Sequence, residues 1–267
     1  MLKRHFYLLA FGMFAVPACP LVAATPLGAW KLEPSDSRCV AVRTYGDAAK
    51  PMTLALKGSL SDGAIQLAVM RPGFRQFFIQ TGAKIEIDGM PYPTSALSYP
   101  TAGNVKLVTH LINVDPAQAG RLRQAKVLSV DVYRGVKDSF PLEPSAKVWR
   151  EMQDCIARVR KTWNVGSENA STIATSASGD LQGLFTPGDY PRPAVWKDQQ
   201  GTTAFLLLID EKGVPKDCTV IGSSGSAALD SRSCGVILVR GKFSPALGQD
   251  GKPMKSAAEK RITWRMQ

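Results

Sequence analysis

Serines, one histidine and several carboxylates are the side chains of this 267-residue chain that could carry out catalysis. The segment 222–225 reads Gly-Ser-Ser-Gly, whereas a serine nucleophile at a strand-to-helix elbow needs the spacing G-x-S-x-G. His110 lies in an alternating apolar segment without an identifiable partner, and Asp115, Asp131 and Asp138 show no pairing typical of acid–base chemistry. The sequence also contains no phosphate-binding loop and no dinucleotide fingerprint. We therefore predict a protein that is not an enzyme, with no catalytic residue, no cofactor and no small-molecule substrate.

The N-terminus has the three parts of a secretory signal peptide. Lys3-Arg4 is positively charged, Phe6–Val16 is apolar, and Val22–Ala24 offers small residues for a signal peptidase. The apolar segment is shorter than the roughly 20 residues that a membrane-spanning helix needs. We predict a signal peptide over residues 1–24 and a periplasmic protein that begins at Thr25. A lipoprotein that begins at Cys19 and an uncleaved membrane anchor are the alternatives.

Charge and export together bear on the class of partner. The chain has a formal net charge of +11, and removal of the signal peptide lowers it to about +9. A basic surface can attract nucleic acid, but no run of five basic residues occurs, and an exported protein does not meet nucleic acid. We therefore predict no nucleic-acid partner.

Four cysteines follow the predicted cleavage site: Cys39, Cys155, Cys218 and Cys234. A metal site is not expected, because there is no Cys-x-x-Cys motif and His110 is the single histidine after cleavage. An even number of cysteines in an exported chain predicts two disulfides, and four cysteines allow three pairings. The spacing favours Cys218 with Cys234, which leaves Cys39 with Cys155.

Residues 25–163 are predicted to form a mainly antiparallel β domain that ends in a helix. Strand-like segments alternate with turn signals such as Ser61-Asp62-Gly63 at roughly ten-residue spacing, which is typical of a sandwich or barrel. Asp115-Pro116 predicts a short helix to about Gln124. The strand-like segments are 38–42, 52–56, 64–69, 84–87, 106–112 and 127–132.

A longer helix is predicted from Pro144 to about Trp163. Its apolar residues Val148, Met152, Cys155 and Val159 recur at helical spacing and form one stripe. Because Cys155 belongs to this stripe, it can face the sheet that holds the other cysteine of its domain. The stripe therefore supports the second disulfide.

Residues 164–183 are small, polar and unpatterned, which predicts a linker between two domains. A flexible coil of this length has an end-to-end distance of roughly 25 Å and would let the domains move independently. The second domain is then expected over residues 184–267, and the fold class of the chain is α+β.

The second domain is predicted to contain two strands, a helix and a third strand. Residues 202–209 and 214–221 are apolar strands around the turn at Glu211–Gly213, and a helix capped by Ser224 or Ser226 follows. The simplest sheet with this order has the first strand at its centre and the last strand, 260–266, on an edge. The charged residues of that last strand suit an exposed edge.

The ordered set of motifs from Tyr190-Pro191 to the C-terminus resembles the C-terminal domain of the TonB family. The set comprises the strands, the segments Ser223-Ser224-Gly225, Leu229-Asp230 and Phe243-Ser244-Pro245-Ala246, and the terminal strand. The resemblance implies a small ββαβ domain in the periplasm that binds a short peptide of an outer-membrane transporter by adding a strand to its sheet. It places the binding edge at Lys260–Met266, with Arg261, Thr263 and Arg265 as the partner-binding residues.

The chain also departs from the family in three ways. In the family's energy transducers an N-terminal membrane helix carries a serine and a histidine, whereas here His5 precedes the apolar segment and residues 1–24 contain no serine. A folded domain replaces the proline-rich spacer, and the pair Cys218 and Cys234 is absent from the best-known members. These differences argue against energy transduction but leave protein or peptide binding in the periplasm, related to TonB-dependent transmembrane transport. The alternatives are a structural or assembly module of an envelope complex and an exported enzyme with an accessory TonB-like domain.

Overall fold

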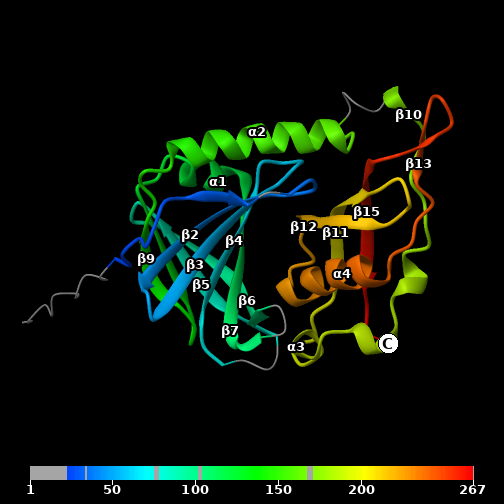
Figure 1. Cartoon of the computed structure of the whole chain (residues 1–267). Coiled ribbons are helices and arrows are strands. Elements are labelled where there is room, and N and C mark those ends of the chain that lie inside the picture. The colour runs from blue at the N-terminus through cyan, green and yellow to red at the C-terminus, as the bar shows by residue number, and fades with distance from the viewer. Residues whose placement is uncertain (1–22, 34, 75–77, 102–103, 167–170, 267) are drawn as a thin grey trace, which may run out of the picture.

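The computed structural model describes residues 23–33, 35–74, 78–101, 104–166 and 171–266 (Figure 1). It contains a large antiparallel β domain with helices and a smaller domain of three main strands and a helix, which confirms the predicted α+β class. Nearly all of the predicted signal peptide lies outside the described residues.

The larger domain is one sheet of nine antiparallel strands in the order β1-β2-β3-β4-β7-β6-β5-β8-β9. Most strands bury alternate residues, as β2 does, because one face of the sheet lines the core. The strands are β1 (Lys31–Glu33), β2 (Cys39–Asp47), β3 (Lys50–Gly58), β4 (Ile65–Pro72), β5 (Ile79–Ile87), β6 (Met90–Thr101), β7 (Asn104–Val114), β8 (Val127–Val132) and β9 (Lys137–Pro141).

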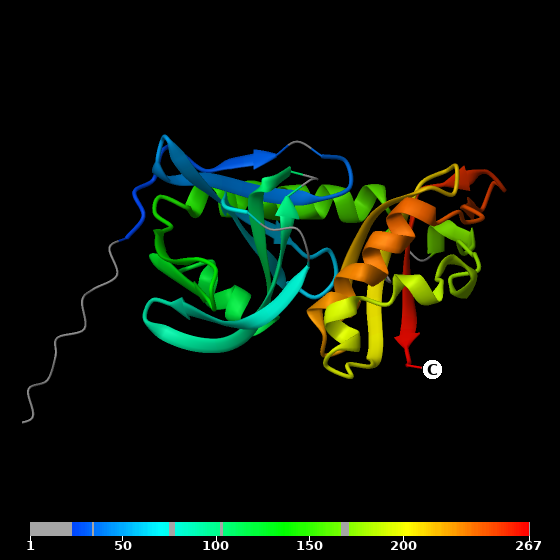
Figure 2. The same ribbon diagram turned by 90° about the horizontal axis from the view of Figure 1, so that it is seen from below.

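The sheet curls so that its two ends approach each other (Figure 2). The chain before β1 lies between these ends: the amide of Ala24 donates to Ser139 in β9, and the amide of Gly46 in β2 donates to Thr25. Side chains of Arg43 and Tyr45 also donate to carbonyls of residues 141–143. The expected sandwich or barrel is therefore a curled sheet that this segment brings close to a barrel.

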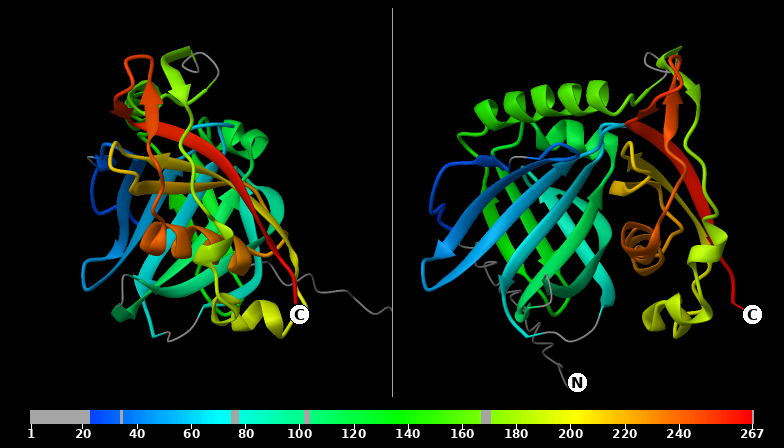
Figure 3. Two further views of the ribbon diagram at one scale, coloured as in Figure 1. Left: turned by 90° about the vertical axis from the view of Figure 1, so that its right-hand side faces the viewer. Right: turned by 45° about the vertical axis from the view of Figure 1, so that its right-hand side comes forward.

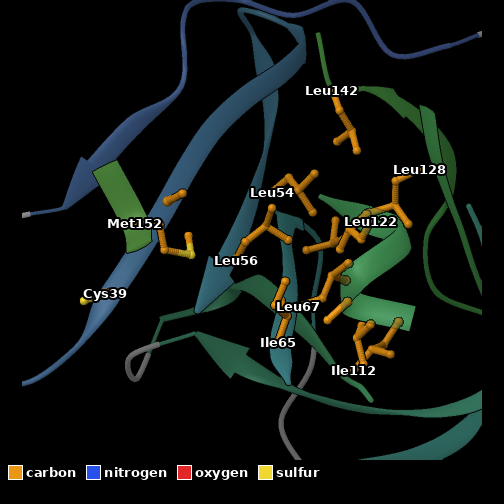
Figure 4. Close-up of a cluster of buried hydrophobic side chains, with 14 of the residues drawn as sticks. Cys39, Leu54, Leu56, Ile65, Leu67, Ile112, Leu122, Leu128, Leu142 and Met152 are labelled. Carbon is orange, nitrogen blue, oxygen red and sulfur yellow. The ribbon is translucent and has the colours of Figure 1, made fainter. Parts of the chain in front are cut away.

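Two helices complete the core of this domain. α1 (Pro116–Leu122) is capped by Asp115, whose carboxylate accepts from the amide of Gln118 at 2.8 Å. Its Leu122 is buried among Leu54, Leu67 and other apolar side chains inside the curl (Figure 4). α2 (Ala146–Thr162) lies across the sheet and buries the predicted stripe, including Met152.

The structure joins Cys155 of α2 to Cys39 of β2, with 5.9 Å between their Cα atoms. It also joins Cys218 to Cys234 across a sequence separation of 16 residues. These are the two pairs that the cysteine spacing predicts.

Strand β6 was missed by the sequence analysis because it contains three prolines, which lack the amide that a central strand needs. Residues 90–96 of β6 pair with β5, whereas pairing with β7 begins at Leu97. Pro91 and Pro93 therefore lie on a locally open edge, where a missing amide donor costs little.

The smaller domain has a sheet in the order β12-β11-β15, with all neighbours antiparallel. The first strand is central and the last lies on an edge, as predicted. The main elements are α3 (Arg192–Val195), β11 (Gly201–Ile209), β12 (Pro215–Gly222), α4 (Ala227–Arg240) and β15 (Ser256–Trp264).

The expected linker is not a free coil in its second half. β10 (Ile173–Thr175) pairs with β13 (Ala246–Gly248), which pairs in turn with β14 (Pro253–Met254). Leu181 and Phe185, close to the short turns η2 (Gln182–Leu184) and η3 (Pro187–Asp189), pack against the smaller domain. Composition misses this because isolated apolar residues at irregular spacing give no periodic signal. The domain boundaries themselves stay a prediction.

The two domains contact each other (Figure 3). Leu206 and Leu208 of β11 join the core cluster of the larger domain. Lys57 of β3 forms an ion pair with Asp217 of β12 at 2.8 Å, and both side chains are largely buried. The structure therefore joins the two domains by an apolar contact and an ion pair in addition to the chain between them.

Candidate functional site

The outer edge of β15 is the candidate site, and its geometry follows from strand alternation. Phe205, Leu207 and Ile209 of β11 pack under α4, whereas Leu206 and Leu208 point to the opposite face. On β15, Ile262 and Trp264 likewise point towards α4. Arg261 and Thr263 must therefore lie on the opposite face, and both are exposed.

The directions of the backbone N–H and C=O groups of β15 follow from the turn between β11 and β12. The amide of Asp210 donates to Val214, so the backbone groups of residue 210 point towards β12. Because successive residues alternate and the register of β11 with β15 is unbroken, Ile209 and every second residue before it point towards β15. Their partners on β15 are Ser256, Ala258, Lys260, Ile262 and Trp264.

The remaining residues of β15 therefore direct their amide and carbonyl groups away from β11. Among these are Glu259, Arg261 and Thr263, all exposed. In the described part of the chain, no backbone hydrogen bond from a loop or another strand reaches this side of β15. The edge thus presents alternate N–H and C=O groups that an extended peptide can pair with.

Trp264 fixes the end of this strand. Its indole N–H donates to Ser233 of α4 at 2.9 Å, and the rings of Phe185 and Tyr190 contact its ring edge-on at 5.3 Å. Thr263 lies against Thr202 of β11, with 2.8 Å between the two hydroxyl oxygens. Arg265, the third predicted residue, lies one position beyond the end of β15 and is exposed.

Two charged features of this domain were not predicted from the sequence. Glu259 adds an acidic side chain to the exposed face beside Arg261. Asp189, which is 2% exposed, accepts hydrogen bonds from Arg232 and Arg240 of α4 and ties residues 187–189 to that helix. Although burial by itself raises the pKa of Asp189, the hydrogen bonds from Arg240, Thr186 and Arg232 hold it well below its usual range. Distant partners of this kind leave no signal in the sequence.

The Ser-Ser-Gly segment forms the strand-to-helix turn expected of it. The carboxylate of the buried Asp230 accepts from the hydroxyl of Ser223, the amide of Ser224 and the hydroxyl of Thr203. Ser226 caps α4 by accepting from the amide of Leu229. These serines therefore satisfy buried polar groups at the start of the helix.

His110 has a partner that the sequence did not reveal. Its Nδ1 lies 2.7 Å from the hydroxyl of Ser98 on the neighbouring strand. Both side chains are 1% exposed, so a substrate has no direct access to either. Within the described residues, no group of histidine, cysteine and acidic side chains could hold a metal ion.

Comparison with known proteins assigns the smaller domain alone. Residues 187–266, well under half of the chain, match the family described as Gram-negative bacterial TonB protein C-terminal, which is non-enzymatic. No curated protein and no solved structure matches the chain. Among the described residues, no helix is both long and apolar enough to span a membrane.

This match fits the geometry of the domain, which has a central first strand, a helix over one face and an open last strand. It implies a protein of the Gram-negative envelope that is linked to TonB-dependent transport. Residues 187–266 are a TonB C-terminal domain, and the N-terminal β domain lies outside this match.

Proposed function

We propose that this protein binds an extended segment of an outer-membrane transporter, or of another envelope protein, by strand addition along β15. The observation that carries the proposal is the open edge, where exposed residues such as Arg261 and Thr263 direct their backbone groups away from the sheet. Backbone pairing would supply most of the affinity. Arg261 and Arg265 would favour acidic or polar side chains near the end of the strand.

The protein acts in the periplasm according to this proposal. Two disulfides agree with an oxidising compartment. Cleavage after Ala24 would remove the contact of its amide with Ser139 and would leave Thr25, whose carbonyl accepts from Gly46, as the first residue. N-terminal sequencing of the protein from envelope extracts should give Thr25, and retention of residues 1–24 or a lipid on Cys19 would contradict this.

Substitution of Thr263 by proline tests the edge. Proline removes one amide donor, and the amide of Thr263 points away from β11, so we expect the sheet to tolerate the change while peptide binding falls at least about tenfold. Thr263→Val is the matched control, because it keeps the amide and the β-branched shape and removes only the hydroxyl beside Thr202.

The measurement is a titration of the full chain with N-terminal peptides of transporters, followed by backbone amide shifts and calorimetry. Saturable shifts should concentrate on residues 257–265 and their neighbours, and Thr263→Val should bind nearly as well as the unchanged protein. If no peptide shifts these amides, or if proline and valine variants bind equally, strand addition at β15 is wrong.

A second candidate is a structural module of an envelope complex, which the contact between the domains favours. Leu206 and Leu208 of the smaller domain are buried in the core of the larger domain, and the ion pair of Lys57 with Asp217 links the two domains. Such a fixed arrangement suits a scaffold. Affinity capture from envelope extracts separates the two: transporters favour the first candidate, and assembly or scaffold proteins favour the second.

A further inference from the structure

Helix α3, at the bottom of Figure 1, and the residues between β4 and β5 carry exposed large apolar side chains. We call Phe74, Phe78, Ile79, Val195 and Trp196 the apolar tip. Phe74 is 68% exposed and Trp196 is 78% exposed, while the other three lie between 40% and 49%. Five exposed large apolar residues at one end of a molecule indicate a contact surface.

Both domains contribute to the apolar tip. Phe74, Phe78 and Ile79 flank the connection from β4 to β5, and Val195 and Trp196 end α3. The ammonium of Lys197, next to Trp196, donates to the carbonyl of Gln80, next to Ile79, at 3.2 Å. This contact joins the end of α3 to the start of β5, so both groups of side chains lie at the same end of the molecule.

The tip is an exposed surface that lines none of the three larger clefts of the described structure. Phe78 stacks on Tyr99, with 5.3 Å between ring centroids, so its ring is held in position. The larger clefts of the described structure, of about 410, 530 and 550 Å³, are lined by residues other than the five of the tip. Protruding side chains on turns suit a deformable partner better than a peptide or a rigid protein surface.

Four cations lie on the segments that carry or adjoin the apolar tip. Lys106, Arg134, Arg192 and Lys197 are exposed at this end. Arg134 lies over the ring of Tyr133 at 5.3 Å, and the amide of Tyr133 donates to Gly82 near the start of β5. In the described segments 71–74, 78–80, 99–101, 104–107, 133–135 and 192–198, Asp198 is the one acidic residue.

Tryptophan and phenylalanine side chains ringed by lysine and arginine are the combination that inserts into the interface of an anionic bilayer. The aromatic rings enter the boundary between headgroups and acyl chains, and the cations stay at the level of the phosphates. We propose that the apolar tip docks the protein onto a membrane surface that contains anionic phospholipids.

Docking at this end would orient both domains together. The C-terminal end of β15 lies at the same end of the molecule (Figure 1). If the proposed function is also correct, the bound protein would hold its peptide edge close to the bilayer surface from which a transporter segment emerges. The lipid contact itself does not depend on peptide binding and is tested without any peptide.

The experiment measures co-sedimentation of the protein with vesicles of phosphatidylcholine alone and of phosphatidylcholine mixed with phosphatidylglycerol. The protein is taken from envelope extracts, and its N-terminus is determined first, because a retained signal segment would bind lipid itself. We expect binding to the mixed vesicles, weak binding to the neutral ones, and a loss of binding at high salt.

The double variant Phe74→Ser with Trp196→Ser removes the most exposed side chain from each domain's part of the tip and should bind at least about tenfold more weakly. Met90→Ser with Val239→Ser is the matched control, since these side chains are 48% and 84% exposed away from the tip. Replacement of Arg134 or Arg192 by Gln should each weaken binding to anionic vesicles about fivefold without reducing the apolar surface, and both keep the contact of Lys197 with Gln80.

Three results would overturn the proposal. The protein could fail to bind anionic vesicles, or it could bind them as well after the tip substitutions as after the control substitutions. It could also bind a soluble protein through Phe74 and Trp196 in the absence of lipid, which would make the tip a protein-binding surface. Thermal unfolding of each variant checks that it is folded. If the serine variants do not fold, the two charge variants still test the proposal.

Discussion

Replacement of Asp189 by Asn tests whether the chain before α3 is held to the TonB C-terminal domain by charge. The buried carboxylate accepts from Arg232 and Arg240, whose side chains are 42% and 43% exposed. Asparagine keeps the shape but removes the charge and turns an amide nitrogen towards hydrogen-bond donors. A hydrogen bond to a charged group contributes about 1.5–3 kcal/mol. The half-exposed arginines can regain water, so we expect a total loss of about 2 kcal/mol at pH 7.

The loss of stability caused by Asp189→Asn should depend on pH in one direction. The folded protein holds the pKa of Asp189 below its usual range, whereas the unfolded value is about 3.9. The stabilisation is therefore complete above the unfolded pKa and is lost as the pH falls through the folded pKa. The difference between the unchanged protein and Asp189→Asn should be constant from neutral pH down to about pH 5 and should shrink below about pH 4.

The assay is urea unfolding across this pH range, followed by tryptophan fluorescence, because Trp264 contacts both Phe185 and Tyr190 of the same segment. Asp180→Asn is the control: that carboxylate accepts from the amides of Gln182 and Gly183 in an exposed turn. We expect the control to change stability by less than about 0.5 kcal/mol. A loss for Asp189→Asn that equals the control, or that grows below pH 4, would refute the reasoning.

Two further substitutions test the remaining covalent and ionic links. Cys234→Ser removes the disulfide with Cys218, which closes a sequence separation of 16 residues, and should destabilise the smaller domain by about 3 kcal/mol with little change in the larger domain. Non-reducing peptide mapping and hydrogen exchange resolved by domain measure this, and equal losses in both domains would contradict it. Lys57→Met leaves Asp217, which is 5% exposed, without its cation and should lower the free energy of unfolding by about 2–3 kcal/mol. In a double-mutant cycle, the further change Asp217→Asn should recover part of this loss, whereas purely additive losses would show that the pair does not couple the domains.

Much of the fold was predictable because local patterns determine local structure. The stripe of Met152 and Cys155 predicted the face that α2 buries, Asp115-Pro116 predicted the start of α1, and the motif order after Tyr190 predicted the sheet of the TonB C-terminal domain. Signals of this kind depend on residues that are neighbours in the chain. β6 and β10 were missed because their pairing partners, and not their own composition, stabilise them as strands.

At the candidate site, too, local patterns predicted some features and tertiary contacts decided the others. The sequence placed the last strand on an edge, since strand order in a small ββαβ sheet follows from short connections. The outward direction of the amide of Thr263, the acidic neighbour Glu259 and the end of the strand before Arg265 required the register of β11 with β15. Register depends on turn geometry and on packing of both faces, which no single strand contains.

The sequence by itself determined the number of disulfides, the α+β class and the presence of a TonB C-terminal domain, because each depends on residue types and their spacing. Only the tertiary structure decided that the two domains contact each other through Leu206 and Leu208 and that Lys57 meets Asp217. It alone also joined Lys197, next to Trp196, to Gln80, next to Ile79, and so brought the two parts of the apolar tip to one end of the molecule. Such contacts join residues more than a hundred positions apart, and their free energy depends on burial and distance, which spacing along the chain does not encode.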